Sequence, residues 1–222
     1  MYDEYWQKKW ESNEIGFHQA NPNPLLNRYF ETLDLQPGSR VFVPLCGKSM
    51  DMLWLAQQGY QVVGVELSTI ACRAFFEEHA IPFTVTQLEH FTLYHSAKIT
   101  LLEGDLFHVS KDLLGQIDAV FDRAALVALP QATRRRYADF LMDLLPPNLR
   151  MLLVAFTYDQ QAMQGPPFSV DSHEVAELYG AKFHIEVLFN EAVPKISPHL
   201  QAKGLTWASE QAYCLRPKDR SF

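Results

Sequence analysis

The sequence predicts an α/β protein built on a doubly wound, mostly parallel sheet of seven strands, one of which is antiparallel. Apolar runs with strand character alternate with helical segments along residues 41–179, a pattern typical of parallel sheets covered by helices. The last two predicted strands, 184–189 and 207–215, have no helix between them, so one of them is expected to run antiparallel. Residues 40–66 read as a strand, a glycine loop, a helix and a second strand that ends in a carboxylate.

The predicted elements follow one another in a regular order. Strands are expected at 41–45, 62–65, 99–102, 117–121, 151–156, 184–189 and 207–215, with a less regular hairpin at 83–95. Helices are expected at 2–11, 25–33, 50–58, 69–79, 133–145 and 171–179.

Local signals justify these elements in order. Aromatic residues at helical spacing predict the first helix, and Pro37-Gly38-Ser39 breaks the chain before the first strand. Strand 41–45 is a continuous apolar run, as in strands that are buried on both faces. Gly59 ends the helix that follows, and Ser68 is expected to cap the next one.

The second half carries similar signals. Residues 117–121 and 151–156 are apolar strands, and Pro146-Pro147 ends the helix between them. Gly180 ends the helix at 171–179. The last two strands are expected to pair as a hairpin through a long connection.

Length and composition favour one globular domain. The chain has 222 residues, of which 48% are hydrophobic and 20% charged, a balance that can fill one core. We therefore expect a single domain over residues 1–222, with residues 1–36 as an N-terminal helical lid. The net charge of −7 argues against nucleic acid as a partner. The one tight basic cluster, Arg134-Arg135-Arg136, is interpreted as a solvated helix face.

Several features favour a cytoplasmic protein. The N-terminus lacks the apolar region of a signal peptide, and no apolar run is long enough to span a membrane. Three scattered cysteines (Cys46, Cys72 and Cys214) argue against a disulfide framework and for a reducing compartment. The eight histidines show no spacing typical of metal ligands. We expect a monomer, because no exposed apolar stripe beyond the lid calls for a partner.

The glycine loop at residues 44–49 predicts a nucleotide-like ligand without phosphates. Gly47-Lys48-Ser49 resembles the end of a triphosphate-binding loop, but Phe42 stands where that motif needs a glycine. The loop also has one glycine where the dinucleotide fingerprint has three, and those glycines allow close approach to a pyrophosphate. S-adenosylmethionine has no phosphate, so the loop favours this cofactor over NAD.

Polar residues that end three predicted strands are candidate ligand contacts. Glu66 is placed to bind both hydroxyls of a ribose, although an acid there could also serve a helix N-terminus. Asp105 is placed to meet the adenine amino group, or is an ordinary turn acid. Arg123 could hold the cofactor carboxylate or a substrate anion, or could pair with Asp122.

The N-terminal aromatic residues allow two interpretations. Trp6, Trp10 and Phe17 are expected to be packing residues of a helical segment. If that segment lies across the strand ends, the same rings exclude water and contact a cofactor or planar substrate, and they favour a sulfonium cation.

Six motifs that span the chain carry a family resemblance. They are Trp6-Gln7-Lys8-Lys9-Trp10-Glu11, Gly16-Phe17-His18-Gln19, Val43-Pro44-Leu45-Cys46-Gly47-Lys48, Val63-Gly64-Val65-Glu66, Asp122-Arg123-Ala124-Ala125-Leu126-Val127-Ala128 and Gly165-Pro166-Pro167-Phe168. Together they resemble thiopurine S-methyltransferase, and the short N-terminus resembles its bacterial members. Seven strands with the last one reversed is also the usual architecture of S-adenosylmethionine-dependent methyltransferases.

The resemblance implies specific residue roles. It implies that S-adenosylmethionine is contacted by Trp10, Leu45, Glu66, Asp105, Leu106 and Arg123. It also implies that Phe17 faces the substrate. The acceptor would be an aromatic or heterocyclic thiol such as a thiopurine, and selenium or tellurium compounds are further candidates.

The expected chemistry is a direct, in-line methyl transfer to a thiolate. An aromatic thiol is partly ionised near neutral pH, so no strong general base is needed. Arg123 could assist as a catalytic residue by lowering the pKa of the thiol. An N- or O-methyl acceptor would usually need a base, for which His18 is the candidate. Two rivals are an NAD-dependent oxidoreductase and a non-catalytic module that binds S-adenosylmethionine.

Overall fold

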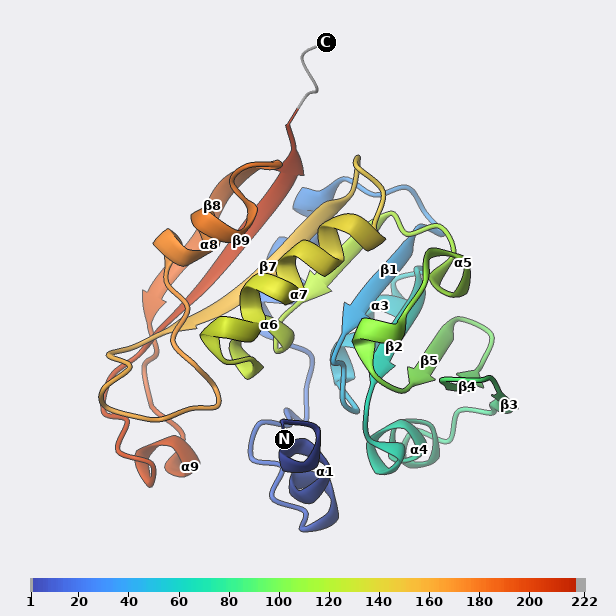
Figure 1. Cartoon of the computed structure of the whole chain (residues 1–222), viewed down its shortest axis with the longest axis horizontal. Coiled ribbons are helices and arrows are strands. Elements are labelled where there is room, and N and C mark those ends of the chain that lie inside the picture. The colour runs from blue at the N-terminus through green and yellow to red at the C-terminus, as the bar shows by residue number, and fades with distance from the viewer. Residues whose placement is uncertain (1, 219–222) are drawn as a thin grey trace. The chain divides into compact units, whose positions relative to one another are not determined.

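The structure, a computed structural model, describes residues 2–218 and forms two compact units (Figure 1). Unit 1 comprises the chain up to Arg28 together with Leu35–Asp118. Unit 2 comprises Tyr29–Asp34 together with the chain from Ala119 onward. The predicted lid segment, residues 1–36, is thus divided between the two units at Arg28.

Unit 1 holds a mixed sheet with a parallel centre. Its strands lie in the order β3-β4-β5-β2-β1, where β1 pairs parallel with β2 and β2 with β5. The hairpin β3–β4 adds antiparallel strands at one edge. The strand bounds are β1 Arg40–Pro44, β2 Gln61–Glu66, β3 Thr84–Gln87, β4 Thr92–His95 and β5 Ile99–Glu103.

Short capped helices connect these strands. Ser49 Oγ accepts from Asp51 N at the start of α3, and Ser68 Oγ accepts from Ala71 N at the start of α4, as predicted for Ser68. Gly59 follows α3 with a φ of +98°. The helices that start in unit 1 are α1 Tyr2–Glu11, α2 Pro24–Tyr29, α3 Met50–Gln57, α4 Thr69–Glu78, the 3₁₀ helix η2 Leu106–His108, and α5 Lys111–Leu114.

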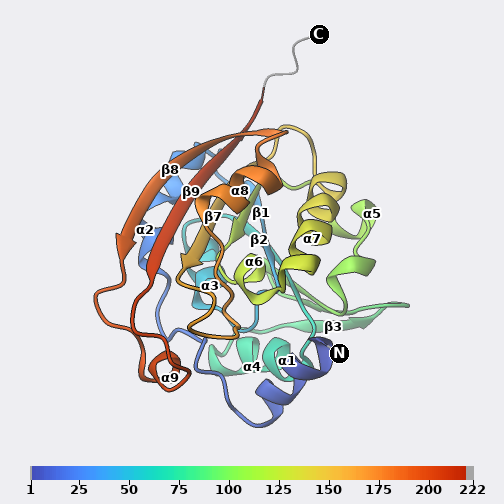
Figure 2. The ribbon, with the colours of Figure 1, turned by 60° about the vertical axis from the view of Figure 1, so that its left-hand side comes forward.

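Unit 2 contains the predicted antiparallel strand. β6 pairs parallel with β7, whereas β9 lies between β7 and β8 and runs antiparallel to both (Figure 2). Its elements are the 3₁₀ helix η1 Phe30–Leu33, β6 Ala119–Asp122, α6 Ala125–Ala128, α7 Gln131–Leu144, β7 Arg150–Thr157, α8 Ser172–Tyr179, β8 Phe183–Ala192, α9 Pro198–Gln201 and β9 Ser209–Pro217.

The α/β class with a parallel core is confirmed, and all seven predicted strands form. The irregular region at 83–95 contributes two further strands, the β3–β4 hairpin. The sheet therefore has antiparallel pairing at β4 with β5, in addition to the predicted antiparallel strand β9. The helix predicted at 25–33 ends at Tyr29 and continues as η1. The single-turn helices α5, α6 and α9 carry too few residues for a periodic signal, and the sequence did not predict them.

One prediction about the basic cluster is wrong. Arg135 and Arg136 are exposed, but Arg134 is only 3% exposed and pairs with Glu174 on α8. The helix α7 turns this one guanidinium inward because successive helical residues point to different sides. Within residues 2–218, no helix combines the length and apolar character that crossing a bilayer requires.

Candidate cofactor site

The glycine loop lies between β1 and α3 and holds two residues in the left-handed region. Leu45 has a φ of +46° and Gly47 a φ of +53°. For a leucine this conformation costs about 1–2 kcal/mol, and such strain is commonly kept where a backbone must meet a ligand. Cys46 N donates to Val65 O over 3.0 Å, which ties the loop to β2. The bond of Cys46 therefore fixes the backbone next to Leu45, the predicted contact residue.

Glu66 ends β2 beneath this loop and is only 6% exposed. Gly47 N donates to its Oε2 and Ser68 N donates to its Oε1, both over 2.8 Å. Each carboxylate oxygen has two lone pairs, so the oriented group keeps acceptor capacity for ribose hydroxyls. Burial raises the pKa of Glu66, and the N–H groups of Ser68, Gly47 and Leu67 oppose that rise.

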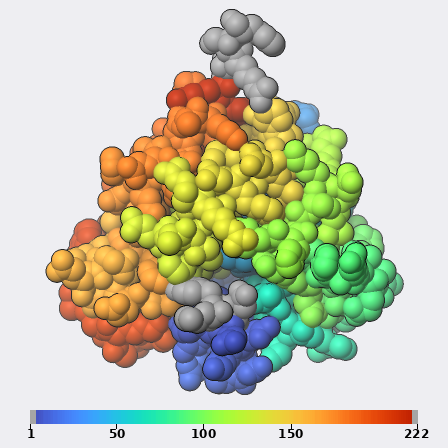
Figure 3. Space-filling view, viewed as in Figure 1, coloured from blue at the N-terminus to red at the C-terminus, as the bar shows by residue number. Residues whose placement is uncertain are grey.

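The N-terminal aromatic residues cover the loop. Trp10 on α1 is 6% exposed, and its Cζ2 lies 3.1 Å from the position that a Cβ at Gly47 would take. Phe17 packs edge-to-face against both Trp10 and Trp6, with ring centroids 5.5 and 5.3 Å apart. α1 contacts α4, and its dark-blue surface lies beside the cyan one (Figure 3). Trp10 is therefore close to the glycine loop, and Phe17, 37% exposed, packs against it. Contact of Trp10 with the cofactor stays a prediction.

The segment after β5 approaches the same acid. Gly104 N donates to Glu66 O over 2.9 Å, which brings the ends of β5 and β2 together. Asp105 Oδ1 accepts from Phe107 N over 2.9 Å and so caps η2, while Leu106 is buried. One oxygen of Asp105 supports the turn, as the turn-acid interpretation requires. The contact of Asp105 with an adenine amino group stays a prediction.

Arg123 follows β6 in unit 2 and is partly buried. The carboxylate before it, Asp122, is completely buried and accepts from Ala125 N, Leu126 N and the Tyr137 hydroxyl over 3.1, 3.2 and 2.7 Å. Burial raises the pKa of Asp122 to about 6, against the lowering effect of these donors. Asp122 therefore shapes the turn that carries Arg123. The role of Arg123 at the cofactor stays a prediction.

Sequence reasoning missed the contribution of backbone donors. The N–H groups of Gly47 and Ser68 orient Glu66, and only the lone glycine of the loop signalled one of them. Sequence reasoning also assigned no role to Lys48 once triphosphate binding was rejected. Lys48 Nζ donates to both carboxylate oxygens of Glu78 on α4, over 2.6 and 2.8 Å, and so anchors the loop.

The residues of unit 1 fit an adenosyl ligand that has no phosphates. The loop directs one N–H at its own acid, and its one lysine is engaged by Glu78, so neither is arranged as a phosphate cradle. The acid keeps acceptor capacity for ribose hydroxyls, and indole covers the loop. Within residues 2–218, no group of three or more His, Cys, Asp or Glu side chains is arranged to hold a metal ion.

Comparisons with known proteins agree with this geometry. Residues 1–218 match the family profile "Thiopurine S-methyltransferase (TPMT)". Relatives named thiopurine S-methyltransferase occur in Nitrosospira multiformis, with 47% identity covering 97% of this chain and 98% of the relative, and in Azotobacter vinelandii, with 44% identity covering 97% and 99%.

Solved structures share the fold at low sequence identity. A Burkholderia thailandensis 1,6-didemethyltoxoflavin-N1-methyltransferase with bound S-adenosylhomocysteine has a TM-score of 0.65 at 15% identity, over 98% of this chain and 87% of that one. A Synechocystis magnesium protoporphyrin IX methyltransferase has a TM-score of 0.61 at 14% identity, over 97% and 100%. The full-length match in sequence, together with the phosphate-free loop and its oriented acid, therefore places this chain in the thiopurine S-methyltransferase family, with S-adenosylmethionine as its cofactor.

Proposed function

We propose that this enzyme transfers the methyl group of S-adenosylmethionine directly to the sulfur of an aromatic or heterocyclic thiol, thiopurines among them. The family match supports sulfur as the acceptor atom. The observation that carries the cofactor assignment is the Glu66 carboxylate, whose oxygens are oriented by the N–H groups of Gly47 and Ser68 and keep acceptor capacity for ribose hydroxyls.

Residues of unit 1 bind and orient the cofactor. Glu66 accepts the ribose hydroxyls, and Asp105 accepts from the adenine amino group while Leu106 contacts the ring. Leu45 presents the loop backbone to the cofactor. Trp10 covers the loop, and its electron-rich face favours a nearby sulfonium. This division is supported by the burial of Glu66, Leu106 and Trp10.

Methyl transfer needs alignment and exclusion of water more than it needs a base. S-adenosylmethionine, when bound, supplies an electrophilic methyl group on a cationic sulfur. The aromatic cluster of Trp6, Trp10 and Phe17 keeps water from the reacting atoms. Two opposite charges disappear during the transfer, so an apolar pocket favours the transition state.

Two side chains are proposed to act on the acceptor. Phe17, 37% exposed, faces the substrate. Arg123 lowers the pKa of the acceptor thiol, or holds an anionic group of the substrate or cofactor, through its positive charge. Selenium and tellurium nucleophiles are further acceptors in this proposal, because they are softer than sulfur and equally suited to a sulfonium methyl.

The same proposal covers the organisation of the protein. The family profile spans both units, which supports one methyltransferase domain with residues 1–36 as its lid. Three free, buried cysteines fit a cytoplasmic enzyme. We propose that it acts as a monomer and that nucleic acids and membranes are not its partners, in keeping with the net charge of −7.

Calorimetry combined with an acceptor screen tests the proposal. We expect binding of S-adenosylhomocysteine, no binding of NAD, and labelled methyl transfer to 6-mercaptopurine and thiophenols, with selenite and tellurite as further acceptors. Glu66→Ala should abolish binding. Cofactor binding without transfer to any acceptor would support the non-catalytic module, and binding of NAD would support the oxidoreductase.

A further inference from the structure

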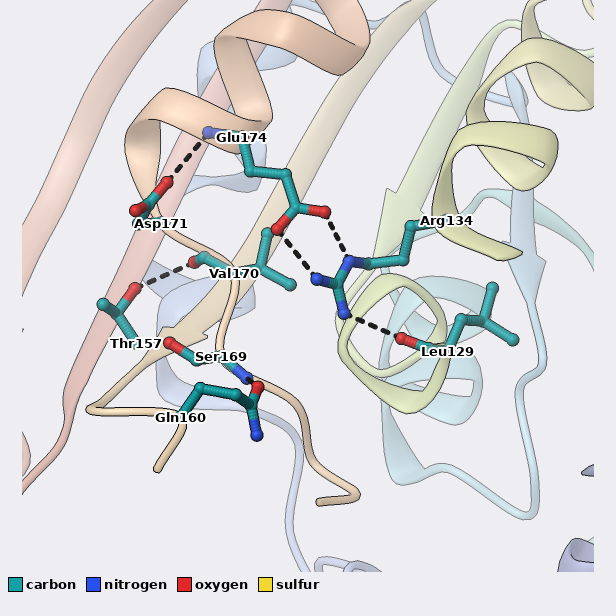
Figure 4. A network of polar contacts seen from close by, with 8 residues as sticks. All are labelled: Leu129, Arg134, Thr157, Gln160, Ser169, Val170, Asp171 and Glu174. Carbon is teal, nitrogen blue, oxygen red and sulfur yellow. Dashed lines mark hydrogen bonds and ion pairs between the residues drawn. The ribbon is translucent and has the colours of Figure 1, made fainter. Parts of the chain in front are cut away.

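Arg134 on α7 makes three side-chain hydrogen bonds within unit 2, to Glu174 and to the Leu129 carbonyl. Its Nε and Nη2 donate to the two oxygens of Glu174 over 2.5 and 2.8 Å, and its Nη1 donates to Leu129 O over 2.9 Å (Figure 4). The Arg134 side chain is 4% exposed and that of Glu174 is 17% exposed. A buried guanidinium needs such pairing to be tolerated at all.

The carbonyl of Leu129 ends α6, the short helix that follows Arg123. α6 spans Ala125–Ala128 and is too short to be stable alone. Its first N–H groups are held by Asp122, and its last carbonyl region by Arg134. The segment from Arg123 to Leu129 is therefore held at its start by Asp122, which ends β6, and at its end by Arg134 on α7.

A neighbouring segment is fixed by the same guanidinium. Phe168 N donates to Val127 O over 2.7 Å, so the chain at Phe168 is bonded to the middle of α6. The Arg134 guanidinium lies 6.0 Å from the centre of the Phe168 ring, within the range of a cation–π contact. Ser169, the next residue, is held by Gln160 Oε1 over 2.9 Å (Figure 4).

We propose that Arg134, held by Glu174, is a positioning residue for methyl transfer: it fixes α6 and thereby sets the place of Arg123. The inference rests on the role proposed for Arg123. Lysine cannot replace arginine here, because one ammonium cannot form the two-point contact with Glu174 and also reach Leu129 O in the fork geometry of a guanidinium.

A double-mutant cycle between Arg134 and Arg123 tests the inference. Arg134→Lys should change the same kinetic quantity as Arg123→Ala, either kcat/KM for the thiol or the KM of the cofactor. We expect a change of roughly ten- to a hundredfold, since a displacement of about 1 Å can cost a hundredfold in rate. In the Arg123→Ala background, Arg134→Lys should have no further effect on that quantity. Glu174→Gln should change the same kinetic quantity in the same direction. This variant provides the test if Arg134→Lys does not fold.

The chain supplies a matched control in Arg135. Arg135 Nη1 donates to Glu177 O over 3.0 Å, so it also links α7 to α8, but it is exposed and this bond does not involve α6. Arg135→Lys should leave kinetics unchanged, and circular dichroism and urea midpoints report folding of every variant.

The outcomes separate two failures. Effects of Arg134→Lys that simply add to those of Arg123→Ala, or that are matched by Arg135→Lys, would overturn the positioning role while leaving the role of Arg123 intact. If Arg123→Ala itself changes neither kinetic quantity, the role proposed for Arg123 is wrong and the inference drawn from it falls as well.

Discussion

Gly47 donates its backbone N–H to Glu66 Oε2 over 2.8 Å, although the two residues are nineteen positions apart in the chain. The bond joins the glycine loop to the end of β2, so the loop orients the acid that we propose binds ribose. Because Ser68 N orients the other oxygen, the carboxylate is prepared for its ligand before the ligand arrives, which lowers the ordering cost of binding.

Cofactor affinity should fall at mildly acidic pH because of Glu66. Burial raises its pKa above the ordinary value of 4.5. The ionised form accepts the ribose hydroxyls, so affinity is constant above the raised pKa and decreases as pH falls through it. Calorimetric titration of S-adenosylhomocysteine from pH 8 to pH 5 measures this fall. Glu66→Gln should bind about ten- to a hundredfold more weakly and lose that pH dependence; an unchanged profile in Glu66→Gln would contradict the assignment.

Gly47→Ala should displace Trp10. A Cβ at this residue would lie 3.1 Å from Trp10 Cζ2, and the positive φ adds about 1 kcal/mol of strain. We expect a shift in tryptophan fluorescence and weaker cofactor binding. Gly38→Ala is the matched control, since Gly38 has a φ of +82° and a Cβ added there would meet nothing within 4 Å. If both variants bind the cofactor equally well, the contact with Trp10 has no part in binding.

Asp105→Ala should remove the preference of the protein for an adenine base, which carries an amino group, over a hypoxanthine base, which lacks it. Asp105 Oδ1 already accepts from Phe107 N, so the second oxygen is the one proposed to contact the ligand. Loss of a hydrogen bond to a charged group costs about 1.5–3 kcal/mol, or roughly ten- to a hundredfold in affinity. Competition between S-adenosylhomocysteine and its inosine analogue measures the preference, which should be strong in the wild type and nearly absent in Asp105→Ala. A preference that persists would leave Asp105 as a turn residue only.

Asp122 should make stability depend on pH in the opposite sense from an ordinary paired carboxylate. Its pKa is raised from 3.8 to about 6 by burial, so the folded state binds a proton more readily than the unfolded chain. Its contribution to stability is therefore present below about pH 4 and is lost as pH rises through 6, a change of about 3 kcal/mol.

Urea unfolding of Asp122→Asn and wild type at several pH values tests this. The wild type should gain stability relative to Asp122→Asn as pH falls from 7 to 4. Asp139→Asn, at an exposed position of α7, controls for the loss of one negative charge. A stability difference that stays constant with pH would show that Asp122 has no raised pKa.

Local patterns were sufficient for the elements of the sheet and for the acid at the end of β2. The apolar run of β1, the glycine loop and Glu66 follow one another closely in the chain. Strand periodicity and the helix cap at Ser68 depend only on residues that are near in sequence. Rejection of a phosphate-binding loop likewise needed only the position of Phe42.

The chain alone thus determined the fold class, the family and the candidate contacts, because each of these depends on neighbours in sequence. Tertiary structure decided which N–H groups aim Glu66, that Trp10 lies over Gly47, and that Arg134 is buried against Glu174 rather than solvated with Arg135. These relationships join residues that are distant in the chain, and they exist only once packing has removed water from between them.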